Sequence, residues 1–313
     1  MSLEKLLKNS KNAVLLGIGG GGDIVGTLPT ANFLKLHGIT SILGGLAWER
    51  SVFDPVPGPR KFKEVSNVKT LNEVVWKANK NSSTITGVKF AESGVSEVTG
   101  KETLLVDINH GPDKVAEGLL DACKKLNADI LIGIDVGGDA VAFGHENGLA
   151  SPLADAIMTS ALYKLNSEIP TLMGIFGFGS DGELTLEELE NSFKTIAQNN
   201  GLLGSWGMTL ETLKLMKEVI EVVKTEASRL PVEYALGNFK NALIRSGTRK
   251  VELNLCSTAT FYIDTNVVFK KISKPAQTVF NCHSLEEANT ALNKIGIKTE
   301  LDLENEKYKE KNL

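Results

Sequence analysis

The sequence predicts an α/β fold, because short apolar runs alternate along the chain with segments of helical periodicity. Runs this short and this apolar are typical of strands buried on both faces of a sheet. Strands that alternate with helices imply right-handed crossovers, and therefore a doubly wound, mostly parallel, Rossmann-like sheet with helices on both faces. Three of the runs lead directly into glycine-rich turns, at residues 17–23, 133–139 and 174–181.

Proline and capping residues help to place the predicted helices. Pro29 lies inside the first helical segment and predicts a break there, because proline removes a helix hydrogen bond. Pro112 and Pro152 instead sit where proline is favoured, at the first position of a helix, and Thr185 opens a capping box. The predicted strands occupy residues 13–18, 40–43, 84–90, 104–108, 130–134, 172–176, 251–255, 261–263 and 267–269. The predicted helices occupy residues 23–37 and 209–224 and begin at Pro112, Pro152 and Thr185, with shorter ones after Thr70, Pro231 and Ser284.

The chain shows no clear linker between residues 11 and 270. We therefore expect one Rossmann-like domain over residues 1–270, followed by a small C-terminal appendage over residues 271–313. The end of this appendage, residues 301–313, is highly charged and poor in apolar residues, which predicts disorder.

The composition disfavours several classes of partner. The 313 residues carry a net charge of -4 and have a pI near 5.7, so we expect no nucleic-acid partner. No apolar run reaches the roughly 18 to 20 residues that a bilayer requires, and no signal-peptide pattern is present, so we expect no membrane partner. Cys123, Cys256 and Cys282 lie far apart, as expected in the reducing cytoplasm. A homo-oligomer is compatible with these features.

The first glycine-rich turn has the spacing Gly-x-Gly-x-x-Gly of dinucleotide-binding proteins, between a predicted strand and a predicted helix. Two features disfavour a nicotinamide or flavin cofactor. Gly44-Gly45 closes the second strand where a ribose-binding acid is expected, and Asp23 would meet the pyrophosphate as a like charge. The backbone amides of the turn could hold another anion, or the glycines could only let a helix pack closely on the sheet. The ligand-binding residues predicted here are Gly19, Gly20, Gly21, Gly22 and Asp23.

An aspartate accompanies each of the three turns. Because ligands bind beyond the carboxyl ends of parallel strands, we expect the three loops to face one crevice. Asp135 and Asp139 flank the second turn, and paired hard oxygens suit Mg²⁺ shared with a substrate phosphate, or general acid–base catalysis. The alternative is structural, since aspartate also caps helices and stabilises turns. Further ligand-binding residues predicted in the crevice are Gly137, Gly138, Gly179, Ser180 and Asp181.

The loop after the second turn offers a second pair of candidate catalytic residues. His145 and Glu146 could move a proton at the rim of the crevice, although a loop histidine is often simply solvated. We interpret Ser151 as a helix cap and Asp155 as a first-turn charge that complements the helix dipole. Residues 180–188 look like half of a calcium loop, but glycines stand where the other ligand carboxylates belong.

Arg50 and Arg60 flank a loop with proline at every second position of residues 55–59. Such a loop is extended and rigid, so it would hold arginine side chains with little loss of entropy. Arginine binds phosphate or carboxylate through two parallel hydrogen bonds, so we predict anion binding by this pair. The alternative is a surface loop whose arginines pair with nearby acids.

Several motifs taken together resemble one family. They are Gly-Gly-Gly-Gly-Asp-Ile-Val-Gly at 19–26, Leu-Pro-Thr at 28–30, Gly-Gly-Leu-Ala-Trp-Glu-Arg at 44–50, Asp-Pro-Val-Pro-Gly-Pro-Arg at 54–60, Gly-Ile-Asp-Val-Gly-Gly-Asp-Ala at 133–140 and Gly-Leu-Ala-Ser-Pro-Leu-Ala-Asp-Ala at 148–156. In these residues the chain is similar to a largely archaeal and actinobacterial family catalogued as domain of unknown function number 1152. The resemblance covers about residues 12–270, implies an α/β fold and brings no activity with it.

These patterns predict an enzyme that binds a small anionic, phosphate- or nucleotide-like metabolite at the glycine-rich strand ends. Hydrolysis or group transfer, assisted by Mg²⁺ at Asp135 and Asp139, fits the residues better than redox chemistry, because the nicotinamide signature is incomplete. A non-catalytic metabolite sensor that uses the same crevice is the alternative. A scaffold subunit with a vestigial crevice is a third possibility.

Overall fold

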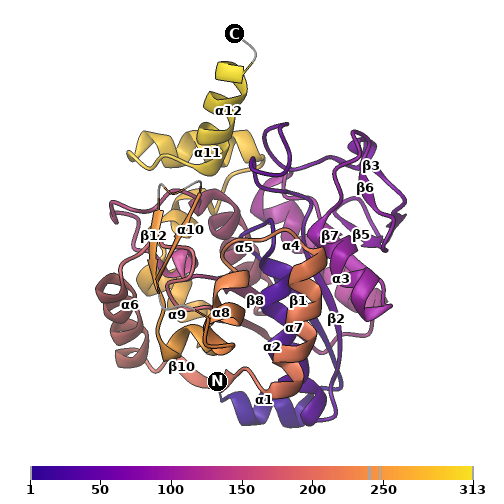
Figure 1. The fold of residues 1–313 in the computed structure, drawn as a ribbon, viewed down its shortest axis with the longest axis vertical. Helices are drawn as coiled ribbons and strands as arrows, with labels where there is room; N and C mark the ends of the chain where they lie inside the picture. Colours follow the sequence, from indigo (N-terminus) through magenta and orange to yellow (C-terminus); the bar gives the residue numbers. More distant parts are fainter. Residues whose placement is uncertain (1, 239–240, 246, 248, 312–313) are drawn as a thin grey trace.

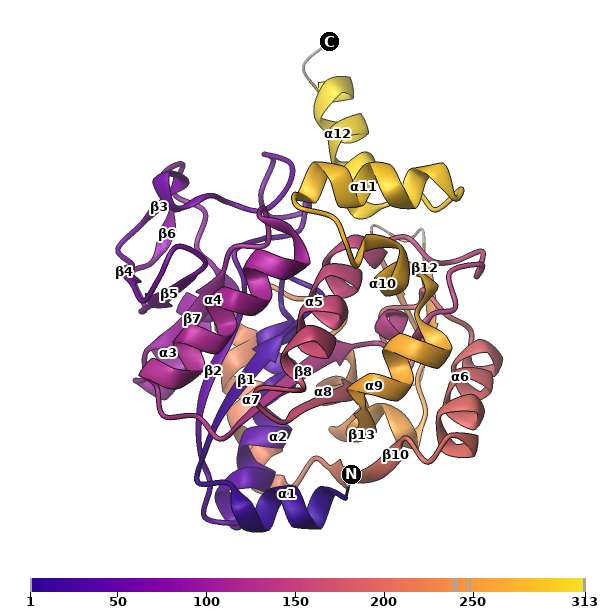
Figure 2. The same cartoon turned by 180° about the vertical axis from the view of Figure 1, so that it is seen from behind.

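A computed structural model describes residues 2–238, 241–245, 247 and 249–311. Within these residues the chain folds around a nine-stranded sheet with helices on both faces, as Figures 1 and 2 show. The strand order is β10-β13-β9-β8-β1-β2-β7-β5-β4. The five central strands, from β9 to β7, run parallel, and the outer strands pair antiparallel. The predicted α/β fold with a mostly parallel core is confirmed.

Six of the nine sheet strands, β1, β2, β7, β8, β9 and β13, overlap apolar runs that the sequence predicts as strands, and β4, β5 and β10 were not predicted. The nine strands are β1 (Asn12–Gly17), β2 (Thr40–Leu46), β4 (Lys69–Thr70), β5 (Val75–Ala78), β7 (Thr103–Val106), β8 (Ile130–Val136), β9 (Thr171–Phe176), β10 (Leu202–Gly207) and β13 (Ala259–Asp264). Two small antiparallel sheets of two strands each lie outside the large sheet, formed by β3 (Val65–Ser66) with β6 (Ser83–Thr84) and by β11 (Asn241–Ile244) with β12 (Arg249–Glu252).

The helices cover the two faces of the sheet (Figures 1 and 2). One face carries α2 (Asp23–Leu36), α3 (Ala91–Thr99) and α7 (Leu210–Val222), and the other carries α4 (Gly111–Lys125), α5 (Pro152–Leu165) and α10 (Lys274–Val279). Neighbouring residues of β1 show the division, because Leu15 packs with the first set of helices and Leu16 with the second. The other helices are α1 (Leu3–Asn9), α6 (Leu186–Gln198), α8 (Arg229–Ala235), α9 (Thr265–Val267), α11 (Leu285–Lys294), α12 (Glu300–Lys311) and the short η1 (Phe62–Glu64), η2 (Asp139–Val141), η3 (Leu255–Thr258) and η4 (Val268–Ile272).

The direction of winding changes at β1. From β1 the chain crosses through α2 to β2 and onward to β7 on one side, whereas β8 and β9 lie on the other side of β1. The loops that follow β1 and β8 therefore leave neighbouring strands in opposite directions. In an open parallel sheet this arrangement opens a crevice at the carboxyl ends of the two strands. The first two glycine-rich turns lie at that point.

Two glycine and proline predictions were wrong because packing outweighs local preference. Helix α2 continues through Pro29, since residues 24–30 are all buried against neighbouring elements. Strand β2 continues through Gly44 and Gly45 to Leu46. These two glycines make room for neighbours, because a Cβ atom would lie 2.6 Å from Leu104 Cβ at Gly44 and 2.1 Å from Glu92 Oε1 at Gly45.

Other local predictions were also wrong. The segment after Thr70 is a turn into β5, because Asn72 Oδ1 accepts hydrogen bonds from the Val74 and Val75 amides. Residues 85–90 form a turn after β6 instead of a continuing strand. Residues 267–269 are helical, since Asp264 caps the amide of Asn266. In the tail, residues 301–311 belong to helix α12, while residues 312 and 313 lie outside the described residues. The domain boundary at residue 270 stays a prediction.

The contact between α2 and β8 gives a first testable prediction. Gly26 of α2 faces β8, and a Cβ atom there would lie 2.4 Å from Val136 Cγ2. Valine in a strand has little rotamer freedom, so Gly26→Ala should lower the free energy of unfolding by about 1–3 kcal/mol, although alanine favours helix. Gly207→Ala is the control, because a Cβ atom at Gly207 meets nothing within 4 Å. Chemical denaturation measures both, and equal stabilities would contradict the close packing.

Candidate metal centre

A cavity of about 30 Å³ lies at the winding change, with room for an ion or about one or two water molecules. Its walls come from the turns after β1, β8 and β9, the loop after β2, the α7–α8 connection and the tip of the β11–β12 hairpin. Four aspartates from the three glycine-rich turns line it, so these turns converge. They are Asp23, Asp135, Asp139 and Asp181.

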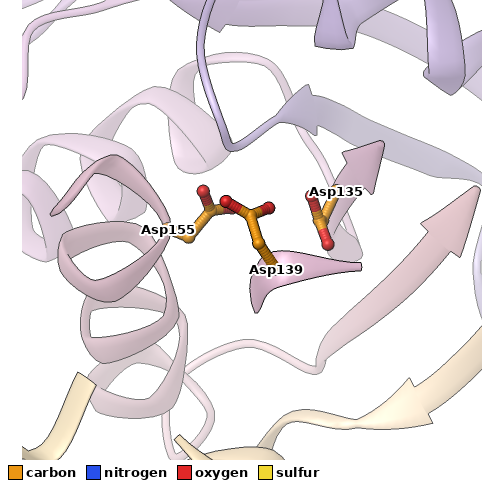
Figure 3. Close-up of side chains that lie close together, drawn as sticks. All are labelled: Asp135, Asp139 and Asp155. Atoms are coloured by element: carbon orange, nitrogen blue, oxygen red, sulfur yellow. The ribbon is translucent and has the colours of Figure 1, made fainter. Parts of the chain in front are cut away.

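Three aspartates place ligand-type oxygens within 4.8 Å of one another (Figure 3). Asp135 ends strand β8, Asp139 begins η2, and Asp155 lies in the first turn of α5. The three residues are 1%, 7% and 2% exposed. Asp135 Oδ1 and both oxygens of Asp155 are buried without a hydrogen-bond partner among the described residues. Buried carboxylate oxygens are normally bonded, so these three oxygens are candidate ligands for a cation.

Asp23 is held against this group by the first glycine-rich turn. Its Oδ2 accepts a hydrogen bond of 3.0 Å from the Gly19 amide. A Cβ atom at Gly19 would lie 2.6 Å from Asp23 Oδ2 and 3.2 Å from Asp155 Oδ2, so only glycine lets the two carboxylates approach. The Gly21 amide donates to the Trp48 carbonyl at 2.7 Å. Two of the four amides expected to cradle an anion are therefore already bonded.

Asp181 approaches from the turn after β9. Gly137 has φ +122°, and a Cβ atom there would lie 2.2 Å from the Asp181 carboxyl carbon. Asp181 Oδ1 accepts from the Glu183 amide at 3.1 Å, while its Oδ2 is buried without a partner among the described residues. Glu183 is well bonded by comparison, because it accepts from the Ala150 and Ser151 amides and from the Ser151 hydroxyl.

Three arginines near the cavity are each matched by a glutamate. The pairs, with their guanidinium–carboxylate N–O distances, are Arg50–Glu300 (3.9 Å), Arg245–Glu226 (3.3 Å) and Arg249–Glu183 (2.9 Å). Arg50 also donates to the Gly19 carbonyl. Glu300 reaches the site from α12 and accepts from the Leu153 and Ala154 amides at the start of α5. After this pairing, the aspartates carry most of the uncompensated charge.

Burial sets the protonation of the aspartates. It raises the pKa of Asp23 and that of Asp181 to about 7. Burial, followed by repulsion from neighbouring carboxylates, raises the pKa values of Asp135, Asp139 and Asp155 well above the ordinary value. The metal-free site therefore holds several protons near neutral pH. A divalent cation would replace those protons.

The family model described as "Protein of unknown function (DUF1152)" matches residues 14–308, and thus every residue of the cavity. The chain belongs to this family. No curated protein and no solved structure matches it. In the part of the chain that the structure describes, no helix combines the length and apolarity needed to cross a membrane.

Three side chains predicted to bind an anion or to move a proton are absent from the lining of this cavity. Arg60 is buried and donates to Asp54 Oδ2 at 2.5 and 3.0 Å, so its charge is used within the proline-rich loop. His145 is exposed. Glu146 accepts from the amides of residues 143–145 and shapes that turn. These three residues therefore lie apart from the cavity, and anion binding by Arg60 and proton transfer by His145 and Glu146 stay predictions.

The remaining predicted residues differ in position. Gly19, Gly20, Gly22 and Arg50 line the cavity. Gly138, Gly179 and Ser180 are absent from its lining: a Cβ atom at Gly138 would meet Leu189, and the Gly179 amide donates to the Gly137 carbonyl. Ser151 does not cap α5 with its side chain, because its hydroxyl faces Asp139 and Glu183.

Sequence reasoning missed four residues of the centre. Asp155 looked like an ordinary first-turn charge, and Glu183 like part of a false calcium loop. Arg245 and Glu300 come from distant segments without a motif. One signal for Asp155 was available, since the helix that follows Pro152 is apolar on nearly all sides, and a charge inside such a helix is buried.

The raised pKa values predict how the stability of the metal-free protein depends on pH. Between about pH 4 and 7 the folded chain binds more protons at Asp23, Asp181 and Glu300 than the unfolded chain does, because burial raises each pKa to about 7. The contribution of these groups to the free energy of unfolding is therefore largest at low pH and is lost as the pH rises through 7. With EDTA, Tm should therefore be lower at pH 8 than at pH 5.5.

Added Mn²⁺ should raise Tm at pH 8 more than at pH 5.5, because cations bind deprotonated carboxylates. Thermal unfolding followed by circular dichroism measures both effects. If Tm changes neither with pH nor with Mn²⁺, the carboxylates are neutralised by positive groups of the chain itself.

Proposed function

We propose that this protein is a cytoplasmic, divalent-cation-dependent enzyme that hydrolyses or transfers a group of a small anionic, phosphate-bearing metabolite. The observation that carries the proposal is Asp155, whose two buried carboxylate oxygens face Asp135 and Asp139 and have no hydrogen-bond partner within the described part of the chain. An unpaired buried carboxylate is costly, and a hard cation such as Mg²⁺ or Mn²⁺ removes the cost by binding oxygen.

The location of the centre supports an enzyme. It lies beyond the carboxyl ends of β1 and β8, where open parallel sheets bind ligands. Mg²⁺ in such sites is commonly held by one or a few carboxylates and by phosphate oxygens of the substrate. Arg50 and Arg245 also line the cavity, so an anion that met the cation would lie beside two arginines that are held in place by Glu300 and Glu226.

Asp23 fits the role of general base. It lines the cavity, and burial raises its pKa to about 7, which suits proton transfer near neutral pH. In hydrolysis, a water oxygen forms a bond to phosphorus while the bond from phosphorus to the leaving oxygen breaks. Asp23 takes the proton that the water loses, and that proton then passes to the leaving oxygen. The cation would stabilise the charge that builds up on the phosphoryl oxygens.

Redox chemistry with a nicotinamide cofactor is less well supported. The pyrophosphate of such a cofactor needs free amides at the first glycine-rich turn. In this chain Asp23 and the Trp48 carbonyl take the amides of Gly19 and Gly21. These contacts support hydrolysis or group transfer instead.

A non-catalytic cation sensor is the second candidate, and the size of the cavity favours it. About 30 Å³ holds an ion but not a metabolite, so a substrate would need part of the cavity wall to move. A sensor would bind the cation with the same aspartates and turn over no substrate.

Asp155→Asn tests the proposal. Mn²⁺ affinity, measured by isothermal titration calorimetry, should fall at least about tenfold, because a ligand oxygen and its charge are lost. Without metal the variant should be as stable as the wild type or more stable, since an unpaired buried charge is removed. Asp113→Asn is the matched control, because Asp113 also lies in the first turn of a helix, α4, but is only half-buried and pairs with Lys164.

Activity is measured as release of phosphate from a panel of sugar phosphates, nucleotides and p-nitrophenyl phosphate with Mg²⁺ or Mn²⁺. The wild type and Asp113→Asn should act on the same substrate, and Asp155→Asn should not. Cation binding without turnover of any substrate would favour the sensor. Equal Mn²⁺ affinity in all three proteins would overturn the metal centre itself.

A further inference from the structure

We infer that the centre has a second cation subsite, formed by Asp139, Asp181 and Glu183, so that two divalent cations share Asp139. This inference rests on the proposed function, which requires only the first subsite at Asp135, Asp139 and Asp155.

The two groups of ligands are geometrically alike. In the second group, as in the first, one ligand oxygen from each residue lies within 4.8 Å of the others. The residues are 7%, 6% and 3% exposed. Asp139 belongs to both groups, and a carboxylate has two oxygens, so it can bridge two ions. The three residues come from η2 and from the turn after β9, two chain segments that meet at the cavity.

Asp181 supplies the observation that points to a ligand. Its Oδ2 is buried without a partner among the described residues, while Oδ1 is fixed by the Glu183 amide at 3.1 Å. The missing side chain of Gly137 gives this carboxylate the space to face the cavity. The carboxylate is therefore oriented by one oxygen and leaves the other for a cation.

The Ser151 hydroxyl lies between two carboxylates and cannot donate a hydrogen bond to both. It lies within hydrogen-bond distance of Asp139 Oδ2, at 3.2 Å, and of Glu183 Oε1. A hydroxyl has one hydrogen, so it can donate to only one of them at a time. Arg249 pairs with Glu183 and keeps that carboxylate ionised and fixed. One of the two carboxylate oxygens is therefore left without this hydrogen bond. A cation between Asp139 and Glu183 would interact with both of them at once.

The number of carboxylates also favours two ions. Glutamates match the three arginines, which leaves the five aspartates of the centre: Asp23, Asp135, Asp139, Asp155 and Asp181. These carboxylates offer more ligand oxygens than one cation needs, and a second cation would bind those of Asp181 and Glu183.

Two cations narrow the substrate class to phosphate esters and anhydrides. A pair of ions that share a carboxylate can stabilise both the attacking and the leaving oxygen of an in-line displacement at phosphorus. A single ion stabilises only one side of that displacement.

The test is the number of Mn²⁺ ions bound by the full-length protein and their magnetic coupling. Calorimetry should give two ions per chain for the wild type, and electron paramagnetic resonance should show exchange coupling through the shared carboxylate. Asp181→Asn keeps the oxygen that accepts from the Glu183 amide, so it should fold normally, bind one ion and lose the coupling. Asp113→Asn should behave as the wild type.

The outcomes separate this inference from the proposed function. One uncoupled ion in the wild type, unchanged in Asp181→Asn, would overturn the second subsite and leave the first in place. Two ions without coupling would overturn the bridging role of Asp139. No bound Mn²⁺ at all would overturn the proposed function together with this inference. A lower Tm of metal-free Asp181→Asn than of the metal-free wild type would show that Asp181 acts in folding instead.

Discussion

Five aspartate carboxylates around one small cavity, four of them buried and that of Asp23 partly buried, set the constraint on which the rest of the site depends. Taking a carboxylate out of water is costly unless a charge or hydrogen bonds replace the water. The chain supplies single backbone amides: that of Gly19 to Asp23, that of Ala140 to Asp135 and that of Glu183 to Asp181. These bonds orient the carboxylates but do not neutralise them. The protein therefore carries an electrostatic cost that protons or cations must remove.

The fold brings the carboxylates together through the change of winding at β1. Neighbouring parallel strands end at the same edge of the sheet, so the turns after β1, β8 and β9 meet there. Glycine is needed at Gly19 and Gly137 because side chains there would overlap the carboxylates of Asp23 and Asp181. The glycine-rich turns therefore serve mainly to make room for aspartate side chains, and less to bind phosphate through backbone amides.

A ring of ion pairs surrounds the aspartates and links distant parts of the chain. Glu300 of α12 connects the C-terminal segment both to Arg50 and to the first amides of α5, the helix that carries Asp155. Glu304 of the same helix accepts from the Trp48 indole at 3.0 Å. Since the glutamates take up the arginine charge, the arginines hold the walls of the cavity without neutralising its centre.

The sequence by itself determined the parallel core and much of the centre, because both depend on local pattern. Apolar runs that end in glycine predict buried strands, and an aspartate directly after such a strand must lie at the edge where strands end, as Asp23, Asp135, Asp139 and Asp181 do. Only the tertiary structure decided which charges meet. Arg60 turns to Asp54, whereas Arg245, from a hairpin far along the chain, lines the cavity. Asp155 became central because α5 is buried on all sides, and Gly44 and Gly45 stayed within a strand because Leu104 and Glu92 fill the space beside them. Pairing and close packing depend on distances between remote segments, which residue order alone does not fix.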